Sequence, residues 1–117
     1  MPIERFAGGA RGRTRASAWR ELVFTVATAE EMGDSIAEQT RVTLEKLDQS
    51  LADAGSGRDR ILSATVYITD IACKAEMDAV WCEWIGGEEN WPQRACVQTG
   101  LAPGTLVEIT LVAARSE

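Results

Sequence analysis

The sequence contains no histidine, and this absence removes several kinds of catalytic site. Serine and cysteine nucleophiles that depend on a histidine base are excluded, together with the usual zinc sites. There are only three cysteines, and none of them forms a C-x-x-C pair: Cys73, Cys82 and Cys96. An odd number of cysteines at such spacing predicts free thiols in a reducing, cytoplasmic environment.

Long apolar runs are also missing. The chain shows no signal-peptide pattern and no run of eighteen apolar residues, so we expect neither secretion nor a membrane span. The 18 acidic residues outnumber the 12 lysines and arginines, which gives the chain a formal net charge of −6. This balance weighs against nonspecific binding to nucleic acid or to an anionic membrane. The glycine-rich segment 8–12 lacks the G-K-[S/T] ending of a phosphate loop, and no other cofactor or metal motif is present.

What remains is the composition of an ordinary globular protein. The 117 residues are 45% hydrophobic and 26% charged, which predicts a single domain over residues 1–117. One local exception to the acidic balance is a group of five arginines in the first twenty residues: Arg5, Arg11, Arg13, Arg15 and Arg20. We interpret them as a charged strand edge that resists aggregation, with a local anion-binding role as the alternative.

The hydrophobic periodicity alternates between a period of two and the helical period. It predicts strands at 15–19, 22–28 and 60–69, helices from Ser35 to Gly55 and from Asp70 to about Ile85, and two terminal strands. Ser35 and Glu38 have the spacing of a capping box, and Gly55 is a natural helix stop. On the strand at 60–69 the pattern assigns Leu62 to the apolar row. The order ββαβαββ indicates an α+β fold with a single sheet.

The last quarter of the chain is the most informative stretch. It reads as two adjacent short strands joined by a turn at Pro103 and Gly104. Alternation places Arg94, Cys96 and Gln98 on one side of the first strand. On the second strand, Glu108 shares a row with apolar neighbours: Leu106, Thr110 and Val112. A carboxylate in such a row needs a partner if the row is buried.

Two helices can cover only one face of this sheet. The other face still carries apolar side chains, among them Leu22, Phe24 and Val26 or their alternates. Because an exposed patch of this kind is a liability, we expect a closed, symmetric and obligate oligomer.

Three segments together resemble the RidA/YjgF family of enamine/imine deaminases. They are Arg94-Ala-Cys96-Val with the Pro-Gly turn and Leu106-Val107-Glu108-Ile109, the strand from Arg60 to Asp70, and the helix segment from Met77 to Trp81. The resemblance runs from about Ile3 to Arg115. It implies a chorismate-mutase-like fold with two helices on one face of the sheet, a homotrimer, and three clefts between subunits. Family members typically hydrolyse reactive 2-imino acids to 2-keto acids and ammonia without a metal or organic cofactor.

The resemblance also implies roles for individual residues. Arg94 matches the arginine that binds the substrate carboxylate, Cys96 matches a cysteine that lines the pocket, and Glu108 matches the glutamate thought to orient the attacking water. Thr14 and Ala27 match positions that contact substrate. Ala27 stands where the family usually has glycine, so its methyl group is expected to narrow or reshape the pocket.

Some alternatives remain open from the sequence. Asp78 replaces a common asparagine. Arg94 and Glu108 could form an interface salt bridge, and Cys96 could be a packing residue. Besides a deaminase, the chain could be a noncatalytic trimer that binds a small carboxylate metabolite or a partner protein. A ribonuclease ranks below both, because the chain is acidic and lacks histidine.

Overall fold

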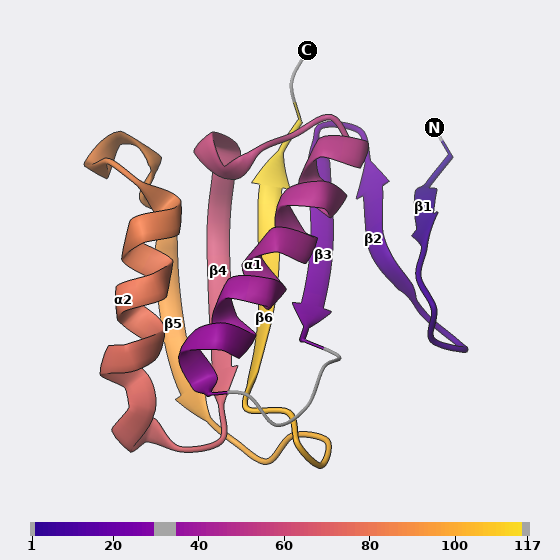
Figure 1. Ribbon diagram of the computed structural model, residues 1–117. Coiled ribbons are helices and arrows are strands. Elements are labelled where there is room, and N and C mark those ends of the chain that lie inside the picture. Colours follow the sequence, from indigo (N-terminus) through magenta and orange to yellow (C-terminus); the bar gives the residue numbers. More distant parts are fainter. Residues whose placement is uncertain (1, 30–34, 116–117) are drawn as a thin grey trace.

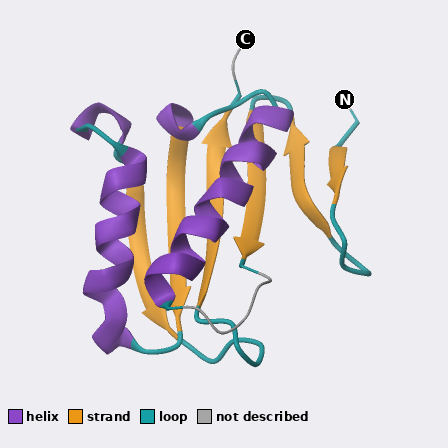
Figure 2. Ribbon diagram, viewed as in Figure 1, coloured by secondary structure: helices purple, strands orange, loops and turns teal. Residues whose placement is uncertain are grey.

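The computed structural model describes residues 2–29 and 35–115, and in these residues six strands form one mixed sheet (Figure 1). The elements are β1 (Glu4–Ala7), β2 (Thr14–Trp19), β3 (Leu22–Thr28), α1 (Ile36–Asp53), β4 (Ile61–Ile68), α2 (Lys74–Ile85), β5 (Gln93–Gln98) and β6 (Val107–Ala114). Both helices lie on one side of the sheet, α1 across β3 and β6 and α2 beside β5 (Figure 2). The expected single sheet with two helices on one face is confirmed.

The chain has one strand more than the sequence predicts. β1 pairs antiparallel with β2 and begins the sheet. Its four residues, Glu-Arg-Phe-Ala, are exposed except for the half-buried Phe6, so they carry too little alternation to be recognised as a strand. The element order is therefore βββαβαββ rather than ββαβαββ.

Helix α1 begins as its capping signal predicts, whereas α2 begins at Lys74, four residues after the predicted cap at Asp70. The Ser35 hydroxyl accepts a hydrogen bond from the Glu38 N–H at 3.2 Å, and a buried stripe of apolar residues then runs along α1. Asp70 caps a short 3₁₀ turn that leads into α2, and Gly86 follows its last residue with φ of 80°. The apolar faces of the helices and the facing sheet rows form one core, centred on Leu44, Leu47, Met77, Trp81, Val66 and Ile109.

The strand order is β1-β2-β3-β6-β4-β5, which corrects the expected terminal hairpin. β5 and β6 follow one another in the chain, but β4 lies between them, parallel to β5 and antiparallel to β6. The cause is the β4–α2–β5 crossover, since a helical connection of this kind returns the chain parallel to its first strand. The connection that contains Pro103 and Gly104 therefore passes the end of β4, where Thr69 N–H donates to the Leu106 carbonyl at 3.2 Å.

Local irregularities change the exposure of two leucines. The register of β4 against β6 shifts between Ile61 and Ser63, so Ile61 is buried and Leu62 is 51% exposed. Leu62 therefore does not belong to the apolar row assigned to it. Leu106 precedes β6 and packs against the helix-side core, rather than standing beside Glu108.

The second face of the sheet has no helix over it. Phe24 on β3 is 45% exposed and Val97 on β5 is 42% exposed, and both side chains belong to this open face. Glu108, Thr110 and Val112 on β6 lie there too, half-buried. No helix in the described part of the chain has the length and apolar character needed to cross a membrane.

Candidate functional site

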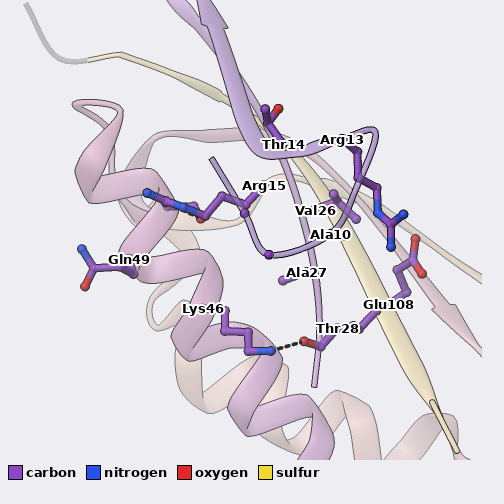
Figure 3. A pocket seen from close by; sticks show the side chains of 13 residues that line it. Ala10, Arg13, Thr14, Arg15, Val26, Ala27, Thr28, Lys46, Gln49 and Glu108 are labelled. Carbon is purple, nitrogen blue, oxygen red and sulfur yellow. Dashed lines mark hydrogen bonds between the residues drawn. The ribbon is translucent and has the colours of Figure 1, made fainter. Parts of the chain in front are cut away.

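A cavity of about 440 Å³ opens where β2 separates from β3 (Figure 3). β2 pairs with β3 only from Ala16, opposite Thr25, to Trp19, opposite Leu22. The last residues of β3, from Val26 to Thr28, pair only with β6 among the described strands. The β1–β2 loop, the end of β3, α1 and β6 line the space: Gly8, Gly9, Ala10, Arg13, Thr14, Arg15, Val26, Ala27, Thr28, Lys46, Gln49, Ser50 and Glu108.

Three of the five predicted site residues meet in this cavity: Thr14, Ala27 and Glu108. Glu108 lies between Thr28 of β3 and Tyr67 of β4 in the sheet register, so its side chain belongs to the open face. Ala27 pairs with the buried Ile109, which places its methyl group toward the helix-covered face. The cavity is therefore present although residue 27 is alanine, where the family resemblance implies glycine.

Arg94 and Cys96 are not in the cavity. Both lie on β5 in register with Ala64 and Val66, whose side chains are buried on the helix-covered face. Arg94 and Glu108 thus occupy opposite faces of one sheet, with β4 between their strands. The arginine, cysteine and glutamate that the sequence places on two adjacent strands do not converge within one chain.

Arg94 has a carboxylate partner in its own chain. Its Nη2 atom lies 2.6 Å from Oδ1 of Asp78 on α2, and its guanidinium stacks 5.3 Å from the centre of the Trp81 ring. Lys74 reaches the other oxygen of Asp78 at 2.7 Å. Partial burial acts to raise the pKa of Asp78, but the hydrogen bonds from Lys74 and Arg94 outweigh it and hold that pKa below its ordinary value.

Cys96 carries a free thiol beside the core on the helix-covered face. Its side chain is half-buried and packs against the helix-side core. Burial raises its pKa above the ordinary cysteine value, although the nearby Arg94 charge opposes the shift. Because the thiolate is the reactive form, the raised pKa makes Cys96 less reactive than an ordinary cysteine.

The cavity also contains residues that the site prediction missed. Lys46, Gln49 and Ser50 come from α1, and Lys46 Nζ donates to the Thr28 carbonyl at 2.9 Å (Figure 3). Arg13 and Arg15 come from the arginine-rich start of the chain. The sequence indicates them only through the alternative interpretation of that segment as an anion-binding site. The sequence does not indicate Lys46, Gln49 and Ser50 as site residues. No local pattern of the helix shows that these polar side chains face a gap between two strands.

The arrangement can bind an anion and position a water molecule. The cavity walls carry the cations Arg13, Arg15 and Lys46 and the single carboxylate Glu108. Cationic donors recognise carboxylates through short charge-assisted hydrogen bonds, and a carboxylate can accept a proton from water. Within the described residues there is no group of three or more histidine, cysteine or acidic side chains that could hold a metal ion.

The fold places the chain in a class of α+β proteins with one mixed six-stranded sheet and two helices on one face. The family model described as Endoribonuclease L-PSP matches residues 22–115. The chain belongs to this family, which is the RidA/YjgF family that its C-terminal motif resembles.

Similar proteins come from several bacteria. A RutC family protein from Haemophilus ducreyi is 40% identical over 78 residues, and the match covers 66% of this chain and 66% of that relative, just under two thirds. The RutC family protein YoaB from Escherichia coli is also 40% identical over 78 residues, covering 66% and 68% of the two chains.

Solved structures match over nearly the whole length. A YjgF-family protein from Neisseria meningitidis superimposes with a TM-score of 0.92 at 34% identity, covering 100% of this chain and 98% of the other. A member of the YjgF/YER057c/UK114 family from Mycobacterium tuberculosis gives 0.85 at 29% identity, covering 97% and 99%. These matches confirm the predicted fold.

Proposed function

We propose that this protein hydrolyses reactive 2-imino or enamine acids to 2-keto acids and ammonia, in a cleft between subunits of a homotrimer. The observation that carries the proposal is the position of Glu108, a carboxylate on the wall of a cavity that Thr14 and Ala27 also line. The reaction needs no metal or organic cofactor, because an imine conjugated to a carboxylate is already electrophilic. We place it in the cytoplasm, which suits the three free thiols.

The positions of Arg94 and Glu108 support a site shared between two subunits. Arg94 lies on the helix-covered face of β5, an edge strand, whereas Glu108 lies on the open face of β6, with β4 between the two strands. A single chain cannot bring both to one small substrate. A neighbouring subunit that places its β5 edge beside the cavity can do so, and the apolar open face with Phe24 and Val97 supplies a surface for that contact.

The chemistry follows from these two groups. Arg94 of one subunit binds the substrate carboxylate, and Glu108 of the next holds a water molecule beside C2 of the imine. Glu108 takes a proton from the water as its oxygen attacks C2, and returns that proton to the nitrogen. In the resulting carbinolamine the hydroxyl proton moves to the nitrogen while the C–N bond breaks, which releases the 2-keto acid and ammonia.

A second function is favoured by one observation. Asp78 already occupies Nη2 of Arg94 at 2.6 Å, so a substrate carboxylate must share this arginine with an internal one. A noncatalytic trimer that binds a small carboxylate metabolite or a partner protein in the same cleft is consistent with this arrangement. The family description also names an endoribonuclease, but a net charge of −6 disfavours binding to RNA.

The deaminase proposal is tested by following the loss of imino acids that an amino-acid oxidase generates in situ. We expect the wild-type protein to accelerate the loss. Glu108→Gln should reduce kcat by about 10²- to 10⁴-fold, the usual contribution of a positioned acid–base group. Arg94→Ala should reduce kcat/KM by roughly 10- to 100-fold because a charge-assisted carboxylate contact is lost.

The control is Arg41→Ala, which removes an exposed arginine of α1 that pairs only with Glu38 and Glu45 among the described residues. It should leave the rate unchanged. If the wild-type protein accelerates the loss of none of several imino acids, the enzyme proposal is wrong and the binding function replaces it. If Glu108→Gln keeps full activity, Glu108 does not activate the water.

A further inference from the structure

Arg13 is a cation of the cavity wall that has no partner among the described residues. In the described part of the chain its guanidinium makes no hydrogen bond and no ion pair. The other cations of the cavity are engaged. Arg15 donates to the Ala7 carbonyl at 3.0 Å and to the Ser50 hydroxyl at 3.0 Å, and it pairs with Asp53 at 2.8 Å. Lys46 binds the Thr28 carbonyl.

The β1–β2 loop presents Arg13 to the same space as Glu108. Gly12 has φ of +86°, a conformation that favours glycine, and the chain turns there immediately before Arg13 and the start of β2. Figure 3 shows the guanidinium of Arg13 and the carboxylate of Glu108 on the same side of the cavity, while Arg15 and Lys46 enter from the other side. No ion pair joins Arg13 to Glu108, so the guanidinium is available to a ligand that reaches Glu108.

We infer that Arg13 binds a carboxylate on the side chain of the substrate, so that dicarboxylic 2-imino acids are the preferred substrate class. This inference rests on the proposed function. If Arg94 of a neighbouring subunit holds the carboxylate next to the imine carbon, and Glu108 stands beside that carbon, the substituent on the carbon extends into the cavity. The cavity of about 440 Å³ has room for a substituent with its own carboxylate.

Charge explains why an acidic substituent is favoured over an apolar one. Asp53 compensates Arg15 in the cavity wall, whereas Arg13 has no hydrogen-bond or ion-pair partner among the described residues. An apolar substituent would displace water from Arg13 without replacing its hydrogen bonds, whereas a carboxylate can accept two of them from the planar guanidinium.

The experiment compares kcat/KM for imines generated from aspartate and glutamate with those from alanine and leucine. For the wild-type protein we expect the dicarboxylic imines to be favoured by roughly 10- to 100-fold, the usual effect of one charge-assisted contact. Arg13→Gln should lower this ratio to near one. The matched control is Arg11→Gln, which removes an exposed arginine from the same loop that does not line the cavity, and which should preserve the ratio.

A binding measurement separates failure of this inference from failure of the proposed function. Calorimetry with 2-oxoglutarate and 2-oxobutyrate should show tighter binding of 2-oxoglutarate, and Arg13→Gln should remove the difference. If this holds but no imine is hydrolysed, the proposed function is wrong and the anion subsite stands. If imines are hydrolysed without preference, or if Arg13→Gln weakens both ligands equally, the subsite for a side-chain carboxylate is overturned.

Discussion

At the scale of single residues, Asp78 determines how Arg94 is presented. The carboxylate of Asp78 binds both Arg94 and Lys74. The three side chains carry a net charge of +1, so the group can still attract one anion. The aspartate therefore fixes the guanidinium against Trp81 and links α2 to β5.

Asp78→Asn should make stability less dependent on pH. The folded-state pKa of Asp78 is lowered below that of an unfolded aspartate, about 3.9, so its contribution is complete above about pH 4 and is lost as the pH falls through the folded value. We expect the variant to lose about 1–2 kcal/mol of unfolding free energy at pH 7 and to match the wild-type protein near pH 2. Urea unfolding at several pH values measures the difference.

Asp59→Asn is the control for this comparison. Asp59 is exposed, and it has no hydrogen-bond or ion-pair partner among the described residues. It should leave the unfolding free energy within about 0.5 kcal/mol of the wild-type value. A constant difference between Asp78→Asn and the wild-type protein from pH 7 to pH 2 would show that the carboxylate charge is not responsible.

At the scale of elements, α1 holds the connection that leads into β6. Gln39 is 1% exposed, and its side chain donates to the Gly104 carbonyl at 2.9 Å and accepts from the Leu106 N–H at 2.9 Å. The connection between β5 and β6 passes the end of β4, where Thr69 N–H bonds the Leu106 carbonyl but no strand bonds the Leu106 N–H or the Gly104 carbonyl among the described residues. Gln39 supplies both missing hydrogen bonds and thereby fixes the entry of the strand that carries Glu108.

Gln39→Leu should destabilise the fold by about 2–4 kcal/mol, because it leaves a backbone carbonyl and a backbone N–H unsatisfied while filling a similar volume. Gln49→Leu is the matched control on the same helix. Gln49 is exposed and bonds only to Asp53 among the described residues, so its loss should change the unfolding free energy by less than about 0.5 kcal/mol. Equal effects of the two substitutions in urea unfolding would contradict the role given to Gln39.

At the scale of the whole molecule, the sheet is asymmetric. One face is covered by α1 and α2, whereas the other exposes Phe24 and Val97 beside half-buried Tyr67 and Val112. Phe24 is opposite Val112 in the register, and Tyr67 is opposite Val97, so apolar side chains stand on four neighbouring strands of this face. An uncovered apolar face of this kind is normally buried against another subunit. The proposed site of Arg94 and Glu108 relies on the same contact.

Phe24→Asp should therefore convert the proposed trimer into monomers, measured by light scattering, because a charge would be buried without a partner at the interface. The monomer itself should remain folded, since Phe24 is 45% exposed in the single chain. Ala79→Asp, on the exposed side of α2, is the control and should keep the oligomer. A wild-type protein that is monomeric at micromolar concentration would contradict the proposal.

The sequence by itself determined the local elements. The buried stripe of α1, the caps at Ser35 and Asp70, the alternation of β6 and the glycine stops all act within a few residues, so periodicity and capping rules identify them. β1 was missed because four mostly exposed residues form a strand only through their pairing with β2. The bulge that exposes Leu62 was missed for the same reason, since register is a property of two strands.

Only the tertiary structure decided which residues share a site. Glu108 and Arg94 are fourteen positions apart, yet the β4–α2–β5 crossover places β4 between their strands and sends their side chains to opposite faces. The same folding brings Arg13, Lys46 and Glu108 to one cavity from three separate segments. Strand order is set by which apolar rows pack together across the whole core, and no local pattern encodes that choice.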